Sequence, residues 1–351
     1  MGDVSAPMPR PSQPPAGPQA GLAQRPKSRR NGPLHYAALD LGTNNCRLLI
    51  ARPQGETFAV VDAFSRIVRL GEGLAASGRL SDAAIERTIA ALSVCADKLR
   101  RRNVTLSRAV ATEACRRATN GTEFIARVHA ETGIRLDIIS PREEARLAVL
   151  GCHPLIEPGD GPALVFDIGG GSTELVLVET REGGTPRILD WQSAPWGVVS
   201  LTESEPLAAG GDEATRRAAY ARMRARVAES FAPFGTRLPQ GERLRLLGTS
   251  GTVTTLASVH LGLTSYDRAA IDGLIVPAPA MRVICAQLAG LSIPERAQQP
   301  CIGSERADLV VAGCAILETI MDLWPAERLG VADRGIREGI LRTLMSGPPG
   351  E

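Results

Sequence analysis

The chain has 351 residues, of which 44% are hydrophobic and 22% charged, and its formal net charge is +2. This length suits two domains, and the composition is typical of a globular protein whose core needs no disulfide or metal. The near balance of charge gives no reason to expect a nucleic-acid partner. No run approaches about 18 apolar residues, so we expect no membrane span.

The seven cysteines are scattered and form no Cys-x-x-Cys pair. This usage indicates neither a disulfide framework nor a zinc site, and it favours a reducing cytoplasm. Residues 1–33 are rich in Pro, Gly, Gln and Ala and contain few large apolar side chains. Because such a segment cannot bury enough apolar surface to fold, we expect a disordered tail there.

The first ordered half begins with three strands, expected at 36–41, 46–51 and 58–70. Ser81 then caps a helix whose apolar positions Ile85, Ile89 and Leu92 share one face. A strand at 108–112, a helix at 120–132 that Gly133 closes, and a strand at 135–139 follow. This order predicts an α/β fold with a mixed sheet.

A helix start at Ser140 marks the junction between the halves. Ser140 suits the N-cap, Pro141 the first helical position, and Glu143 the reciprocal position of a capping box. We place the hinge region at about 140–160. The second half is then expected to contain strands at 163–166, 174–178, 188–193, 243–247 and 328–332, and helices at about 212–230, 252–260, 278–290, 304–323 and 335–346.

The two halves open with matching segments. Ala38-Leu-Asp-Leu-Gly matches Val165-Phe-Asp-Ile-Gly, and the turns that follow have the same length. An internal duplication of this kind predicts two glycine turns on opposite walls of one cleft. Backbone N–H groups exposed in such turns suit phosphate. Taken singly, each turn is also explained by the ordinary use of glycine in hairpins.

The duplication also reveals an asymmetry, because Arg47 in the first hairpin is equivalent to Glu174 in the second. A site that holds a phosphate and a metal or water needs charges of both signs. The alternative is that both are surface residues at the start of a strand. Asp167 is placed at the mouth of its turn for a metal or a water.

Seven motifs, in order along residues 36–346, resemble the exopolyphosphatase/guanosine pentaphosphate phosphohydrolase family. They begin at Asp40 (DLGTN), Val68 (VRLGEG), Ala111 (ATEACR), Ile139 (ISPREEAR), Asp167 (DIGGGSTE), Gly248 (GTSGT) and Gly335 (GIREG). The resemblance implies two duplicated actin-like ATPase (RNase H-like) domains with mixed five-stranded sheets facing a central cleft. Their expected bounds are 36–140 with the C-terminal helix at about 335–346, and 141–334.

The resemblance implies a Mg²⁺-dependent hydrolase that releases the terminal phosphate of inorganic polyphosphate. The implied catalytic carboxylates are Glu144 and Glu174, and the implied metal ligands are Asp40, Asp167 and Glu174. The implied phosphate-binding residues are Thr43, Asn44, Arg47, Arg116, Gly169, Gly170, Gly171, Ser172, Gly248, Ser250 and Gly251. Glu113 lies in a matching motif too, but the start of a helix explains it as well, so it is left out of the site.

Other functions stay open at this stage. Within the same family, hydrolysis of the 5′ γ-phosphate of guanosine pentaphosphate (pppGpp) is the alternative, and a kinase or ATPase of the superfamily or a non-catalytic sensor follows. The chain's four histidines do not form the His-Asp pattern of longer members, so processive action on long polymer is not implied. A cytoplasmic enzyme is expected, and a homodimer is left open as its assembly.

Overall fold

The computed structural model describes residues 34–55, 57–180, 184–206, 210–236 and 244–346. The disordered tail expected at 1–33 lies outside these residues. The ordered elements begin at Tyr36, where the sequence predicts the first strand. Within the described ranges, no helix combines the length and the apolar character that crossing a bilayer requires.

A five-stranded sheet forms the first half, in the order β3-β2-β1-β4-β5. Its strands are β1 (Tyr36–Leu41), β2 (Asn45–Gln54), β3 (Thr57–Ile67), β4 (Leu106–Ala111) and β5 (Leu136–Ile138). The first three pair antiparallel and the last two join in parallel, so the sheet is mixed as predicted.

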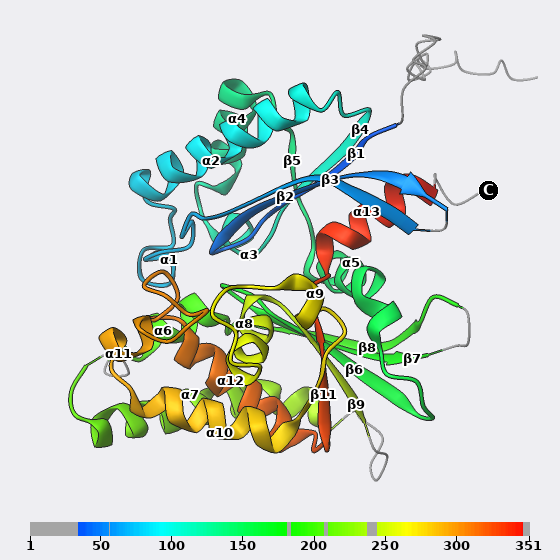
Figure 1. Cartoon of the computed structure of the whole chain (residues 1–351). Coiled ribbons are helices and arrows are strands. Elements are labelled where there is room, and N and C mark those ends of the chain that lie inside the picture. Colours follow the sequence, from blue (N-terminus) through cyan, green and yellow to red (C-terminus); the bar gives the residue numbers. More distant parts are fainter. Residues whose placement is uncertain (1–33, 56, 181–183, 207–209, 237–243, 347–351) are drawn as a thin grey trace, which may run out of the picture. The chain divides into compact units, whose positions relative to one another are not determined.

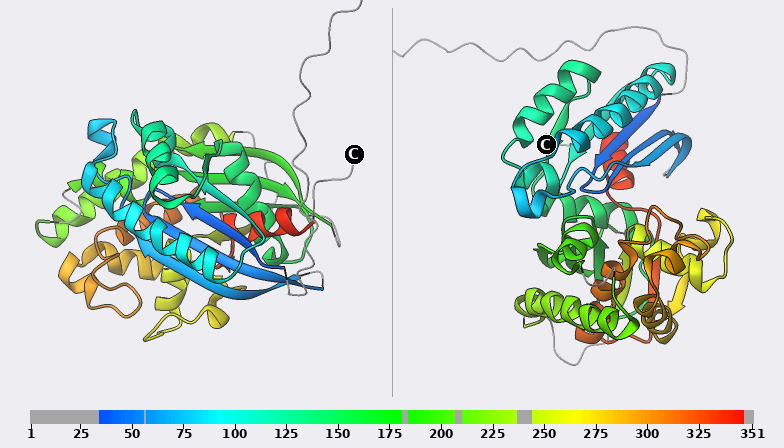
Figure 2. Two further views of the ribbon diagram at one scale, coloured as in Figure 1. Left: turned by 90° about the horizontal axis from the view of Figure 1, so that it is seen from above. Right: turned by 90° about the vertical axis from the view of Figure 1, so that its left-hand side faces the viewer.

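The helices of the first half are α1 (Leu74–Ser77), α2 (Asp82–Arg101), α3 (Glu113–Arg117) and α4 (Gly121–Thr132). Helices α2 and α4 lie side by side in both figures (Figures 1 and 2). The predicted face of α2, with Ile85, Ile89 and Leu92, packs into one core with the side chains of β1 and β2. Ser81 caps α2 by accepting the Ala84 N–H at 3.3 Å.

The second half repeats this strand order and adds one strand. Its sheet runs β10-β11-β9-β6-β7-β8, with β6 (Pro162–Ile168), β7 (Thr173–Glu179), β8 (Arg187–Ala194), β9 (Arg245–Thr249), β10 (Ile275–Pro277) and β11 (Arg328–Ala332). The expectation of five strands is therefore wrong for this half. Strand β10 has three residues and ends in a proline, so it carries no alternating pattern and fits only at the edge.

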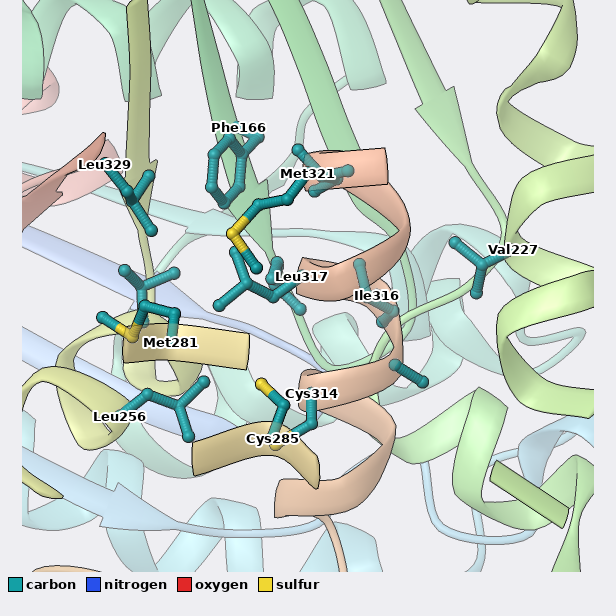
Figure 3. Packing of buried hydrophobic residues seen from close by; sticks show 14 of the residues in the cluster. Phe166, Val227, Leu256, Met281, Cys285, Cys314, Ile316, Leu317, Met321 and Leu329 are labelled. Carbon is teal, nitrogen blue, oxygen red and sulfur yellow. The ribbon is translucent and has the colours of Figure 1, made fainter. Parts of the chain in front are cut away.

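The helices of the second half are α6 (Val198–Ser204), α7 (Glu213–Gly235), α8 (Gly251–His260), α9 (Arg268–Ile271), α10 (Ala278–Gly290), α11 (Ile293–Ala297) and α12 (Val310–Leu323). Helix α12 lies in the core, where Ile316, Leu317 and Met321 pack near Phe166 of β6 (Figure 3). It begins at Val310, not at 304 as expected, because 304–309 forms turns whose polar side chains bond to other segments.

Two helices, α5 (Pro141–Cys152) and α13 (Ile336–Ser346), pack against each other (Figure 1). A short 3-10 turn, η1 (His153–Leu155), follows α5. Ser140 caps α5 as predicted, by accepting the Glu143 N–H at 3.2 Å. The prediction that Glu143 forms the reciprocal half of a capping box is wrong. Its carboxylate instead pairs with Arg108 at 3.0 Å and Arg146 at 2.7 Å.

Candidate active site

The two glycine hairpins have the same local geometry. In the β1–β2 turn the Gly42 N–H donates to Asn45 O at 2.9 Å, and in the β6–β7 turn the Gly169 N–H donates to Ser172 O at 2.9 Å. The strand registers agree too, because Asp40 is paired with Arg47 and Asp167 with Glu174. The duplication read from the sequence is therefore present in the backbone, including the exchange of Arg for Glu.

The turns of the two hairpins touch each other. A Cβ atom on Gly170 would lie 2.9 Å from Thr43 Cβ and 3.0 Å from the backbone N of Asn44. A Cβ atom on Gly171 would lie 2.7 Å from Thr43 Oγ1. Glycine is therefore needed at these positions because two backbones approach closely, and each turn forms part of the other's surroundings.

Helix α6 holds the carbonyl groups of the second turn. Gly169 O accepts the Val198 N–H at 2.9 Å, Gly170 O accepts the Val199 N–H at 2.8 Å, and Gly171 O accepts the Ser200 hydroxyl at 3.2 Å. Within the described residues, the backbone N–H groups of Gly170 and Gly171 make none of the backbone hydrogen bonds found in turns, loops and caps. The same holds for the N–H groups of Thr43 and Asn44 in the first turn. Four N–H donors therefore remain available for an anion.

A cavity of about 130 Å³ lies where the hairpins meet. Nearly all of the residues that the sequence assigns to the site line it: Asp40, Thr43, Asn44, Arg47, Glu144, Asp167, Gly169, Gly170, Gly171, Ser172, Glu174, Ser250 and Gly251. Two assigned residues, Arg116 and Gly248, do not. The lining also includes Glu113 and Arg306, which the sequence reasoning left out or missed.

Gly248 is a packing residue. It belongs to strand β9, not to the turn that the sequence suggested. A Cβ atom here would lie 2.7 Å from the ring of Phe166, a core residue labelled in Figure 3, and 2.9 Å from Val253 Cγ2. Because a buried aromatic ring fills the space beside Gly248, the structure does not support the assignment of this residue to phosphate binding.

Glu144 is a buried carboxylate in the first turn of α5. Its Oε2 accepts a hydrogen bond from Arg116 Nη1 at 2.9 Å. Burial and the charge of Glu174 raise the pKa of Glu144 well above its usual range, although Arg116 opposes the shift. A carboxylate with a raised pKa accepts a proton more readily near neutral pH than an ordinary one.

Arg116 directs its guanidinium group to protein acceptors. Besides Glu144, it donates to Ile139 O from Nη1 at 2.7 Å and to Glu113 Oε2 from Nη2 at 2.7 Å and Nε at 3.2 Å. These bonds use four of its five N–H groups. The phosphate clamp implied by the resemblance is therefore not the arrangement observed, because the side chain lies behind the carboxylates.

Glu174 is the second residue of strand β7, next to the second turn, and is buried. Its Oε1 accepts the hydroxyl of Ser172 at 2.8 Å and that of Ser193 at 2.9 Å. Burial and the charge of Asp167 raise the pKa of Glu174 to about 7, although both serines lower it. The sequence reasoning missed Ser193, which reaches the site only because β8 pairs with β7 in this register.

Asp40 and Asp167 are the next-to-last residues of the first strand of each half. Burial raises the pKa of Asp40, and burial together with the charge of Asp40 raises that of Asp167 to about 6. Asp40 Oδ1 is buried and has no hydrogen-bond partner. In the described part of the chain, no three His, Cys, Asp or Glu side chains are grouped to hold a metal. The predicted set of Asp40, Asp167 and Glu174 is thus not a closed three-carboxylate site.

Two arginines bring positive charge to the cavity. The guanidinium of Arg47 reaches the second half, where its Nη2 lies 3.4 Å from the position of a Cβ on Gly251. Arg306 lies in the turns before α12, and its Nη1 donates to Thr255 Oγ1 at 2.7 Å. This hydrogen bond uses one of the five N–H groups of the guanidinium. The only sequence signal for Arg306 is a charged run just before an apolar helix.

The sequence of this chain is similar to those of known proteins. The family model described as the Ppx/GppA phosphatase family matches residues 49–346. A relative from Mycobacterium tuberculosis (strain ATCC 25618 / H37Rv), named exopolyphosphatase 2, is 33% identical over an alignment of 326 residues, and the match covers 88% of this chain and 98% of the relative. A relative from Aeromonas salmonicida, named guanosine-5'-triphosphate,3'-diphosphate pyrophosphatase, is 31% identical over 315 residues, which are 90% of this chain and 60% of that protein.

Solved structures confirm the fold class. A Ppx/GppA enzyme of Aquifex aeolicus has 29% identity and a TM-score of 0.72, with 88% of this chain and 99% of that chain covered. An exopolyphosphatase from Cytophaga hutchinsonii has 25% identity and a TM-score of 0.77, with 89% and 98% covered.

Proposed function

Because the chain belongs to the Ppx/GppA phosphatase family, we propose that it is an exopolyphosphatase, a hydrolase that releases the terminal phosphate of inorganic polyphosphate. One observation carries this proposal: unpaired turn amides and buried carboxylates line the same cavity of about 130 Å³. The Mycobacterium tuberculosis relative bears the name of this activity, and the match extends over 98% of its length.

The size and lining of the cavity suit one end of a phosphate chain. Its 130 Å³ is well below the roughly 300–1,000 Å³ of sites that enclose a drug-sized ligand. The amides of the two turns would bind the phosphoryl oxygens, with Arg47 and Arg306 opposite their negative charge. The remainder of the substrate would extend out of the cavity.

In the proposed reaction, a water molecule attacks the terminal phosphorus and the bridging P–O bond breaks. Glu144 orients the water and accepts its proton, for which a raised pKa is suited. The electron pair of the broken bond stays on the shortened chain. Glu174, held by Ser172 and Ser193, contributes the second carboxylate. The turn amides stabilise charge on the transferred phosphoryl group.

Phosphatases of this family generally depend on a divalent metal. The residues fit one, since Asp40 Oδ1 is buried without a partner and carboxylate oxygens suit hard cations. We propose Mg²⁺, with ligands among Asp40, Asp167 and Glu174. Mg²⁺ usually keeps several waters and takes one or two carboxylates, which agrees with the open arrangement described here. When bound, it would neutralise charge on the phosphate oxygens.

Hydrolysis of pppGpp is the second candidate. The Aeromonas salmonicida relative bears a name for that activity, but the match covers 60% of its length. Both substrates present a terminal phosphoryl group, and a cavity of this size would receive only that end of either. The raised pKa of the buried Glu144 favours a catalyst over a non-catalytic sensor, because a sensor needs no general base. A kinase or ATPase also uses a carboxylate beside the phosphate, so the assay below includes ATP.

A phosphate-release assay on the purified protein tests the proposal. With Mg²⁺, we expect release from polyphosphate to exceed release from pppGpp and ATP. Glu144→Gln should lower the rate by roughly 10²–10⁴-fold, because it removes the general base. Glu143→Gln is the matched control, since its carboxylate pairs with Arg108 and Arg146 and does not line the cavity. Faster turnover of pppGpp would favour the second candidate.

The compartment is proposed from the cysteines. All seven are free thiols, and all except Cys301 are buried. Since a protein with this many unpaired cysteines fits a reducing environment, we propose a cytoplasmic enzyme.

A further inference from the structure

Glu113 lies beside the second glycine turn, next to Gly171. It is the first residue of α3, its side chain is 14% exposed, and it lines the cavity. Both Nη2 and Nε of Arg116 donate to its Oε2, at 2.7 and 3.2 Å. The opposite edge of the same guanidinium, Nη1, donates to Glu144 Oε2 at 2.9 Å. One planar group therefore joins two carboxylates.

The second turn limits how far Glu113 can move. A Cβ on Gly171 would lie 3.0 Å from Glu113 Cγ and 3.4 Å from Glu113 Cβ, so the turn packs closely on the stem of this side chain. The other cation near Glu113, Arg117, is 3.8 Å away and 42% exposed. The carboxylate is therefore held toward Arg116 by packing on one side and by two hydrogen bonds on the other.

We propose that Glu113 is a positioning residue, which fixes the plane of Arg116 so that its Nη1 holds Glu144 against the cavity. This inference rests on the proposed function, because it assigns a task within that site. Without Glu113, three N–H groups of Arg116 lose their partner or have none, and only the bonds from Nη1 to Ile139 O and Glu144 remain. The guanidinium can then turn about this one edge, so its plane, and with it the direction from which Nη1 meets Glu144, is no longer fixed. The charge of Arg116 would remain, but the position of the carboxylate would be lost.

A simpler role for Glu113 makes a different prediction. An acidic residue in the first turn stabilises a helix through its charge alone. Aspartate serves that purpose as well as glutamate. For positioning, Glu113→Asp fails, because its carboxylate is one methylene shorter and no longer reaches Arg116. The aspartate variant therefore separates the two roles.

The experiment compares Glu113→Asp, Glu113→Gln and Glu113→Ala in the full chain, with Arg117→Ala as the control. We expect kcat for polyphosphate to fall roughly 10- to 100-fold in the three Glu113 variants, with KM changed less than about threefold. Arg117→Ala should match the wild type. In a Glu144→Gln background, Glu113→Gln should cause no further loss, because its effect passes through Glu144.

Two results would overturn the inference. Full activity in Glu113→Asp would assign the residue to the helix start, and a raised KM with unchanged kcat would assign it to substrate binding. A measurement that needs no turnover separates this inference from the proposed function. In ¹⁵N NMR, the Nε–H signal of Arg116, assigned with Arg116→Lys, should be sharp in the wild type and lost in Glu113→Ala. If neither substrate is hydrolysed yet this signal behaves so, only the proposed function fails.

Discussion

At the scale of single residues, the site contains four carboxylates that are shielded from water and whose charges act on one another. Asp40, Asp167, Glu144 and Glu174 all have a raised pKa, in each case chiefly because burial disfavours the charged form. Such a group destabilises the folded chain at neutral pH, and a bound cation would remove that penalty. The four carboxylates are therefore better suited to binding and catalysis than to stability.

Asp167 gives the first prediction at this scale. Its pKa is 3.8 in the unfolded reference and about 6 in the folded chain, so the folded state binds more protons between these values. The free energy of unfolding of the metal-free protein should thus fall as the pH rises from 4 to 7. Asp167→Asn removes this contribution, and at pH 7.5 it should be more stable than the wild type by on the order of 2–3 kcal/mol.

Urea denaturation in EDTA at pH 4 and pH 7.5 measures this difference. The exposed Asp137 provides the control, and Asp137→Asn should change little at either pH. Equal stability of Asp167→Asn and the wild type at pH 7.5 would contradict the assigned pKa. Mg²⁺ should stabilise the wild type at pH 7.5 more than it stabilises Asp167→Asn, because the variant lacks a proposed ligand.

At the scale of elements, we expect the close contact of the two hairpins to be the feature most sensitive to mutation. Gly170→Ala places a Cβ 2.9 Å from Thr43 Cβ and 3.0 Å from Asn44 N, so one backbone must shift. We expect kcat/KM for polyphosphate to fall by roughly 100-fold while circular dichroism stays unchanged. Gly210→Ala is the matched control, since no atom lies within 4 Å of its added Cβ. Normal activity in Gly170→Ala would show that the turn amides are not needed in this arrangement.

At the scale of the whole described unit, α5 connects the two sheets. Its residues Ala145 and Val149 pack on β6 and β7, whereas Leu147 and Ala148 pack with α13 and the first sheet. The crossing with α13 depends on close backbone contact at Gly339. Because Glu144 lies in the first turn of α5, the position of this carboxylate, the proposed general base, depends on the crossing.

Gly339→Ala tests that dependence. Its Cβ would lie 2.0 Å from Leu147 O, so the two helices must separate. We expect a lower melting temperature, from a loss of about 1–3 kcal/mol, together with a lower kcat because Glu144 moves. Thermal unfolding and phosphate release on the same preparation measure both, with Gly210→Ala again as the control. A stability loss without any change in kcat would show that Glu144 is held independently of the crossing.

Much of the fold could be predicted from local patterns. Apolar runs mark most strands of both halves, and the repeated Asp-x-Gly segment predicts that the halves share one strand order. Strand β10 and the true start of α12 could not be predicted, because contacts with distant segments define them. Gly248 shows the same limit of sequence-based prediction. A glycine that leaves space for a ligand cannot be told by sequence from one that leaves space for a phenylalanine ring.

The sequence by itself determined the duplicated halves, the paired glycine turns and the carboxylates that accompany them, because each depends on residues near one another along the chain. Only the tertiary structure decided which partners those groups take. Arg116 forms hydrogen bonds with Glu113 and Glu144 and does not line the cavity. Ser193 reaches Glu174 from the neighbouring strand. The physical reason is that a hydrogen bond depends on distance and direction, and for groups far apart in the chain the packing of α3, α5 and β8 sets both.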